Sequence, residues 1–144
     1  MTTAIPYLCV QDAAGALDFY VRAFGATETM RLSEPDGKVG HAEIEIDGAR
    51  IMLSDEYPDY GVLSPKTLGG AGMSIHLNVN DVDAFAARAV AAGATLKKPA
   101  EDQFYGERTA KLEDPFGHSW QVTTTIEEVS VEEMQRRYDA LMKG

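Results

Sequence analysis

A single internal repeat limits what this chain can fold into more than any other feature of its sequence. The segment Leu8–Asp12 (LCVQD) is followed 69 residues later by the similar segment Leu77–Asp81 (LNVND). Two further pairs repeat at nearly the same spacing: Gly-Ala-Thr at 25–27 and 93–95, and Asp-Gly at 47–48 with Phe-Gly at 116–117. A fixed period of this length indicates a duplicated supersecondary unit. We therefore expect one domain built from two similar modules.

The first module, residues 4–55, has the pattern of a strand, a helix and three further strands. Asp12 is a good helix N-cap because its side chain can accept an unpaired backbone N–H. Gly25 is well placed to end that helix in the left-handed conformation. Polar and apolar residues alternate over 41–46, which is typical of a half-buried strand. The dipeptide Asp47-Gly48 then predicts a tight hairpin.

The second module, residues 73–126, repeats this order, and the intervening residues 56–72 are predicted to form a linker at the rim of a cavity. A last helix is expected over 130–143, where Ser130 and Glu133 form a capping box. Its apolar residues fall on one side: Val131, Met134, Tyr138, Leu141 and Met142. This helix is expected to pack either on the domain or on a second subunit. The fold class is α+β, with two tandem βαβββ modules and a C-terminal helix.

The charge and composition exclude several kinds of partner. A formal net charge of −10 over 144 residues argues against nucleic acid and anionic membranes, because both require a basic surface. The charge suits a neutral or cationic ligand, although it is equally explained by solubility. No apolar run approaches the roughly 20 residues of a membrane helix, and the N-terminus has no secretory signal pattern. The single cysteine, Cys9, fits a reducing compartment, so we expect a cytoplasmic protein.

Several motifs carry a resemblance to a known family. They are Ala16–Tyr20 (ALDFY) with Phe24–Ala26 (FGA), Gly40–Ala42 (GHA), Ile51–Asp55 (IMLSD), Tyr105–Arg108 (YGER) and Asp114–Trp120 (DPFGHSW). Together with the duplicated element order, they resemble the vicinal oxygen chelate superfamily of glyoxalase I, bleomycin-resistance proteins and extradiol dioxygenases, and most closely its PhnB-like subgroup. The resemblance implies a pseudo-two-fold curved mixed sheet around a small-molecule cavity. Bleomycin-binding relatives share that cavity between two subunits, so it also implies a homodimer.

The resemblance also indicates where a divalent metal would be held. Metal-dependent relatives use His, Gln or Glu on the first and last strands of each module, and the matching positions here are Ile5, Met52, Ser74 and Gln121. The repeat supports this placement, because positions 5 and 74, and 52 and 121, are each 69 apart. Zinc, nickel or iron needs several imidazole, thiolate or carboxylate ligands. We therefore expect no metal at these positions and no cofactor.

A relocated site remains an alternative. Strand alternation directs the neighbours at i+2 to the same face, so a His41–Glu43–His76 cluster is the candidate for acid–base catalysis or a moved metal. The opposing interpretation is that these are hydrogen-bonded polar residues of the cavity. The predicted ligand-binding residues are Tyr7, Met52, Ser54, Asp55, His76, Asn78, Tyr105, Arg108 and Gln121.

Three other side chains have alternative interpretations. Arg108 either binds a ligand carboxylate or phosphate or forms an ion pair with Glu43 or Asp114. His118 is expected to face away from the cavity as a turn and packing residue. Cys9 has no basic neighbour in the sequence to lower its pKa, so it is expected to be a buried, unreactive thiol.

Two functions follow as hypotheses. The first is a metal-independent small-molecule binding protein, as in drug sequestration. The second is a lyase, isomerase or dioxygenase-like enzyme that acts on a small carbonyl or phosphonate-related compound through His41, Glu43 and His76. An accessory protein that keeps only the fold is a third possibility.

Overall fold

The computed structural model describes all residues 1–144, and the first module forms one four-stranded mixed sheet with one helix. Its elements are β1 (Tyr7–Val10), α1 (Ala13–Phe24), β2 (Thr27–Ser33), β3 (Val39–Ile46) and β4 (Ala49–Asp55). The strand order is β1-β4-β3-β2, in which only the β1–β4 pair is parallel. The hairpin between β3 and β4 turns at Asp47 and Gly48, whose φ angles are 47° and 87°, as the Asp-Gly signal predicts.

The second module repeats this architecture. Its elements are β5 (Ser74–Asn78), α3 (Val82–Ala92), β6 (Thr95–Asp102), β7 (Glu107–Glu113) and β8 (Ser119–Thr125). The strand order is β5-β8-β7-β6, again with one parallel pair. The prediction of an α+β fold with two βαβββ modules and a C-terminal helix is therefore confirmed. Hydrogen bonds join the strands into two sheets, one for each module.

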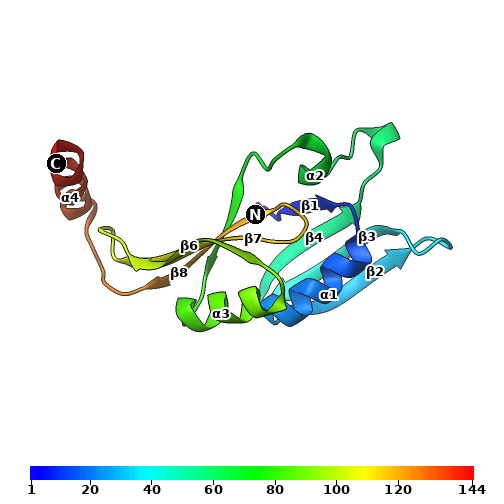
Figure 1. Cartoon of the computed structure of the whole chain (residues 1–144), viewed down its shortest axis with the longest axis horizontal. Helices are drawn as coiled ribbons and strands as arrows, with labels where there is room; N and C mark the ends of the chain where they lie inside the picture. Colours follow the sequence, from blue (N-terminus) through cyan, green and yellow to red (C-terminus); the bar gives the residue numbers. More distant parts are fainter.

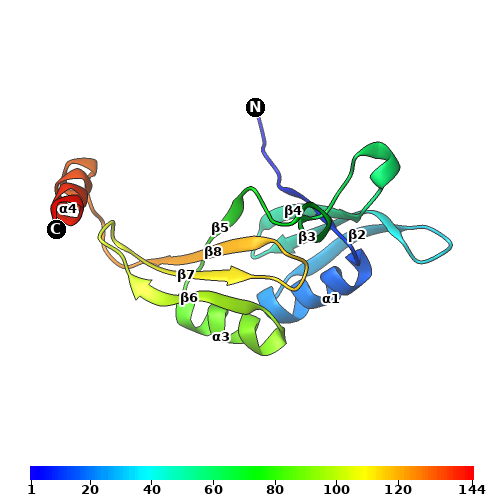
Figure 2. The same cartoon turned by 45° about the horizontal axis from the view of Figure 1, so that its top comes forward.

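The connecting and terminal segments form three short or isolated helices. Between the modules lie a 3-10 turn, η1 (Pro58–Tyr60), and α2 (Pro65–Leu68). The last helix, α4 (Val131–Lys143), stands at one end of the elongated molecule, and module one lies at the other end (Figure 1). In a turned view, α1 and α3 lie together beneath the two sheets (Figure 2). None of the helices is long and apolar enough to cross a membrane.

Helix caps fix the ends of α1 and α3. The carboxylate of Asp12 accepts from the backbone N–H of Gly15, and Asp81 does the same for Ala84. Gly25 ends α1 in the left-handed conformation with φ 67°. An uncapped helix end leaves backbone groups without partners, so these caps set where each helix begins and stops. The predicted N-cap and C-cap of the first helix are confirmed.

Each sheet has one buried face and one open face, because side chains alternate along a strand. On β5, Ile75 and Leu77 are buried, whereas His76 between them is exposed. On β8, Trp120 and Val122 are fully buried. The buried faces pack on α1 and α3, and the open faces carry the polar side chains. The polar residues that the sequence places toward a cavity therefore share the uncovered faces of the sheets.

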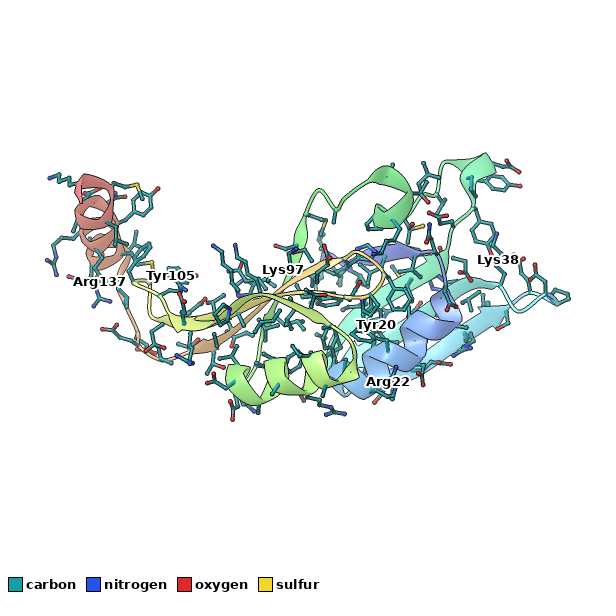
Figure 3. The ribbon with its side chains drawn as sticks, viewed as in Figure 1. Tyr20, Arg22, Lys38, Lys97, Tyr105 and Arg137 are labelled. Carbon is teal, nitrogen blue, oxygen red and sulfur yellow. The ribbon has the colours of Figure 1, made fainter.

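An aromatic core joins the two modules. Phe24 of α1 packs on Trp120 with ring centroids 4.8 Å apart and stacks on Phe85 of α3 at 5.2 Å. Tyr20 of α1 lies in the same core (Figure 3). Its hydroxyl donates to the buried carboxylate of Asp114 at 2.6 Å, and Trp120 Nε1 donates to the same oxygen at 2.9 Å. Burial, and then the charge of Asp114, raises the pKa of Tyr20 well above its ordinary value, so Tyr20 remains a donor.

Candidate functional site

A chain of hydrogen bonds crosses the open face of the module-one sheet. The Tyr7 hydroxyl lies 2.8 Å from His41 Nδ1, and His41 Nε2 lies 2.8 Å from Glu43 Oε2. Arg50 completes the chain, because its Nη2 and Nε donate to Glu43 Oε1 at 2.6 Å and 3.1 Å. The residues come from β1, β3 and β4, whose register brings them to one face. The cluster thus joins four side chains from three strands.

The charge of Glu43 fixes the proton positions in this chain. Hydrogen bonds from His41 and then Arg50 lower the pKa of the Glu43 carboxyl below its ordinary value. An ionised carboxylate only accepts hydrogen bonds, so His41 Nε2 donates to Glu43, and a neutral His41 ring then accepts from the Tyr7 hydroxyl through Nδ1.

The exposure of these side chains increases toward Tyr7. The Glu43 side chain is 14% exposed and that of His41 is 25% exposed, whereas Tyr7 is 49% exposed. A small molecule approaching the sheet therefore meets the ring and hydroxyl of Tyr7 first. Behind it, His41 can accept a proton, and Glu43 can stabilise the imidazolium that forms.

Tyr7 also separates two pockets. One, of about 520 Å³, is mainly apolar and is lined by Ala4, Ile5, Pro6, Tyr7, Leu8, Met73, Ile75, His118 and Ser119. The other, of about 450 Å³, is lined by Tyr7, Glu34, Gly40, Ser54, Tyr57, Tyr60 and Val62. Apolar walls with a few polar groups are typical of small-molecule sites. These two pockets and Tyr7 form the candidate binding site.

The open face of module two carries a different set of groups. His76 Nε2 lies 4.0 Å from Glu107 Oε2, and Glu107 accepts from the hydroxyl of Thr123 at 3.0 Å. His76 therefore belongs to another sheet than His41 and Glu43, and the structure does not bring the three together. Gln121 and Tyr105 line a small pocket of about 150 Å³ on this face. Asn78 lines a third pocket of about 450 Å³ between the modules, together with His76.

The residues at the metal positions of the family do not fit a divalent cation. Met52 pairs in register with Tyr7, and Gln121 pairs with His76. Ile5 has no donor atom, and Ser74 offers only a hydroxyl. Divalent transition metals require several imidazole, thiolate or carboxylate ligands. Nowhere in the chain do three or more His, Cys, Asp or Glu side chains gather closely enough to hold a metal ion.

Three predicted ligand-binding residues have structural partners. Asp55 is buried, and its two oxygens accept from the backbone N–H of Ala13 and Val39 at 2.9 Å and 2.7 Å. Ser54 is also buried, and its hydroxyl donates to a backbone carbonyl. Arg108 pairs with neither Glu43 nor Asp114. Its partners are instead Asp83 at 2.9 Å and Asp102 at 3.0 Å.

Arg108 therefore connects α3, β6 and β7, because Asp83 and Asp102 lie on the two neighbouring elements. The ion-pair alternative from the sequence named Glu43 and Asp114, and Arg108 pairs with other carboxylates instead. The Asp55 carboxylate links β4 to the start of α1 and to β3, so it stabilises the fold of module one.

Cys9 and His118 match their sequence predictions only in part, because Cys9 is only partly buried and His118 does not face away from the pockets. Burial, and then the charges of Glu56 and Asp55, raises the pKa of the Cys9 thiol to about 11, so this thiol stays protonated at neutral pH. His118 donates through Nε2 to the backbone carbonyl of Cys9 at 2.8 Å, which is a structural contact between the modules. It also lines the larger pocket beside Tyr7.

Arg50 is the one residue of the hydrogen-bonded cluster with Tyr7, His41 and Glu43 that the sequence analysis did not name. The hairpin at 47–48 pairs Glu45 with Arg50 and Glu43 with Met52. Arg50 is thus the diagonal cross-strand neighbour of Glu43, which long side chains can reach. The register of the hairpin was a usable signal for this ion pair.

Comparison with known proteins identifies the family. The Glyoxalase/Bleomycin resistance protein/Dioxygenase superfamily profile matches residues 3–122. An uncharacterized protein of Mycobacterium tuberculosis is 46% identical over 133 residues, which span 90% of this chain and 78% of that protein. The crystal structure of TioX from Micromonospora sp. ML1 is 27% identical with a TM-score of 0.67, covering 88% of this chain and 100% of TioX.

A PhnB protein of Bacillus cereus shares the fold at 19% identity and a TM-score of 0.65, covering 86% of this chain and 100% of that one. The family profile extends over both modules. The chain therefore belongs to the glyoxalase/bleomycin resistance protein/dioxygenase superfamily, and PhnB-like proteins are among its structural neighbours.

Proposed function

We propose that this protein binds a neutral or cationic small molecule beside Tyr7 without using a divalent metal. The observation that carries the proposal is the position of Tyr7, which separates two pockets while its hydroxyl is held by His41. The residues at the family's metal positions support a metal-free site, since Ile5 and Met52 replace hard donors. A lone protonated thiol supports a cytoplasmic location, and the family supports a homodimer.

The preference for a cationic ligand rests on the pocket that contains Tyr57 and Tyr60. Glu34 adds a carboxylate to this aromatic wall. The ring of Tyr57 already accepts a cation, because Lys38 Nζ lies 4.4 Å from its centroid. Aromatic faces attract ammonium and guanidinium groups through their quadrupole, so a second cation from a ligand would find the same kind of surface.

A thermal-shift titration tests the proposal with bleomycin as a cationic glycopeptide. A ligand at about 100 times its Kd stabilises a protein by about 2.7 kcal/mol, which is a readily measured rise in Tm. Tyr7→Ala is expected to lose most of this rise, whereas Val21→Ala, at an exposed position on α1, is expected to keep it. An unchanged rise in Tyr7→Ala would overturn the proposed site. One tightly bound metal per chain in elemental analysis would overturn the metal-free site.

A second candidate is an acid–base enzyme acting on a small carbonyl compound, favoured by the ordered chain from Glu43 through His41 to Tyr7. An oriented imidazole is the usual general base. In the same titration, stabilisation by the methylglyoxal–glutathione adduct alone would favour this candidate. His41→Gln should then abolish turnover of the adduct, and His76→Gln, on the other sheet, should retain it.

A further inference from the structure

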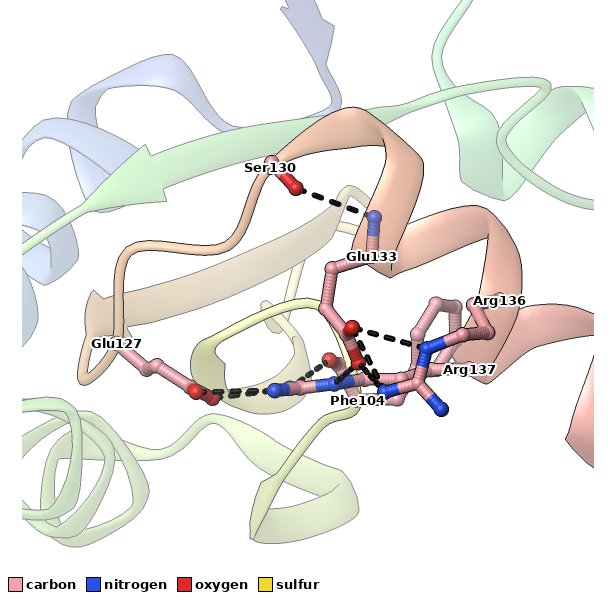
Figure 4. A network of polar contacts seen from close by, with 6 residues as sticks. All are labelled: Phe104, Glu127, Ser130, Glu133, Arg136 and Arg137. Carbon is pink, nitrogen blue, oxygen red and sulfur yellow. Dashed lines mark hydrogen bonds and ion pairs between the residues drawn. The ribbon is translucent and has the colours of Figure 1, made fainter.

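Helix α4 is held to the rest of the chain through Arg137 and Tyr138. No other helix or strand packs on it. Arg137 fixes its orientation by donating to the carbonyl of Phe104 at 2.8 Å and by pairing with Glu127 at 2.9 Å (Figure 4). Ser130 Oγ accepts from the N–H of Glu133, whose carboxylate binds Arg136 and Arg137 and does not return to Ser130. Only the Ser130 half of the predicted capping box therefore forms.

The apolar side of α4 is left uncovered. Val131 is 75% exposed, Leu141 58% and Met142 66%. Tyr138 touches Phe104, with ring centroids 5.8 Å apart, but is still 46% exposed. No residue of the helix is buried. A contiguous exposed apolar face on a fixed helix indicates an interaction surface, and the chain itself offers nothing that covers it.

The surface area of the single chain indicates that a second copy is the occupant. A compact monomer of 15.6 kDa exposes about 7,250 Å², whereas this chain exposes 8503 Å². The excess of about 1,250 Å² exceeds the roughly 800 Å² that each partner buries in a standard interface. One further chain that covers this excess would bring the molecule to the surface area of ordinary folded proteins.

The same chain carries a surface that suits the helix. Neither α1 nor α3 covers the open face of the module-one sheet, and this face exposes Tyr7 at 49% and Leu32 at 58%. A helix of 13 residues is about 20 Å long, and four strands spaced about 4.8 Å apart make a sheet of similar width. Helix α4 and module one lie at opposite ends of the molecule (Figure 1).

We propose that α4 packs on the open module-one sheet of a second copy in an antiparallel two-fold dimer. Because the two surfaces lie at opposite ends, one two-fold axis brings each α4 onto the partner's module one, so the assembly closes with the same contact made twice. The partner's helix then covers the hydrogen-bonded side chains of Tyr7, His41, Glu43 and Arg50. The binding site is therefore incomplete in a monomer. This inference rests on the homodimer of the proposed function and specifies which elements form it.

Light scattering coupled to size-exclusion chromatography tests the contact with full-length chains. Leu141→Asp is expected to raise the dimer Kd at least 100-fold, because it buries a charge in an apolar interface. Val90→Asp, on the exposed side of α3, is the matched control and should remain a dimer. The Trp120 fluorescence of both variants should match that of the wild type, since α4 contributes nothing to the core.

A wild-type monomer would overturn both the homodimer and this contact. A dimer that survives Leu141→Asp, or one that is lost equally in Val90→Asp, would overturn the contact alone. Loss of ligand binding at Tyr7 is measured separately by the thermal shift, so the two failures are distinguishable.

Cross-linking tests the pairing of α4 with module one directly. Leu141→Cys and Leu32→Cys chains, mixed and treated with a bismaleimide, are expected to form one heterologous cross-linked dimer, because the protonated Cys9 thiol reacts slowly. Cross-linking of Leu141→Cys chains alone would show that α4 packs on α4. That result, or the absence of any cross-link, would overturn the arrangement.

Discussion

Asp114 is the residue on which the junction of the two modules most depends. Its Oδ2 accepts from Tyr20 and Trp120, and its Oδ1 accepts from the backbone N–H of Phe116 and His118. It is only 2% exposed. All four donors lose their partner together if the carboxylate is removed. Sequence analysis placed Asp114 in one of the motifs that carry the family resemblance, and the structure adds that its carboxylate connects α1 to the second module.

Asp114→Ala is therefore expected to destabilise the protein by about 3 kcal/mol or more, because buried donors without partners each cost about 1–3 kcal/mol. Tyr20→Phe, which removes one hydroxyl from the same network, should cost about 1 kcal/mol. Urea denaturation followed by far-UV circular dichroism measures both. Asp102→Ala, at an exposed carboxylate, is the control and should cost less than about 1 kcal/mol. If Asp114→Ala and Asp102→Ala lowered the free energy of unfolding equally, Asp114 would not hold the junction of the two modules.

At the scale of elements, the end of α1 depends on the second module. Gly25 has a φ of 67°, and a Cβ added there would lie 3.1 Å from Nη1 of Arg88 on α3. The guanidinium of Arg88 also donates to the Arg22 carbonyl at 2.8 Å, so it satisfies an unpaired group at the end of α1. One arginine of α3 thus stabilises the C-terminus of α1.

Comparison of two glycine variants separates backbone strain from this contact. Gly48→Ala should lower the free energy of unfolding only by the cost of placing alanine in the left-handed conformation, about 1–2 kcal/mol. Nothing lies within 4 Å of the added Cβ, so no steric cost is added. Gly25→Ala has the same conformational cost and also displaces the Arg88 side chain. Its free energy of unfolding should therefore fall further than that of Gly48→Ala. In an Arg88→Ala background the difference between the two variants should disappear. A difference that persists in that background would show that Arg88 is not its cause.

At the scale of the whole molecule, the shared aromatic core should make the modules unfold together. Leu53→Ala creates a cavity in the module-one sheet, where Leu53 is fully buried, and is expected to cost about 2–5 kcal/mol. Trp120, the single tryptophan, reports on module two. Its fluorescence midpoint in urea should fall as far as the circular dichroism midpoint does. An unchanged Trp120 transition would mean that the modules unfold independently.

Much of each module was predictable because it follows from local rules. The internal repeat predicted the duplication, and Asp12 and Gly25 predicted the two ends of the first helix. The alternation of side chains along a strand indicated which residues of β5 and β8 face the core. Partners of side chains were less predictable. The ion-pair alternative for Arg108 named the wrong carboxylates, and His76 was grouped with residues of another sheet, because these contacts depend on how far apart the sheets stand.

The sequence by itself determined the two βαβββ modules, their caps and their hairpin. It also determined that Ile5, Met52, Ser74 and Gln121 stand at the positions that the family resemblance assigns to metal ligands. Only the tertiary structure decided that two separate sheets meet through α1 and α3, that Tyr7, His41, Glu43 and Arg50 form one chain, and that α4 stands apart. The physical reason is range. Helix capping and strand alternation act over a few neighbouring residues, whereas the packing of α1 on α3 depends on the shapes of surfaces about 60 to 80 residues apart in the chain.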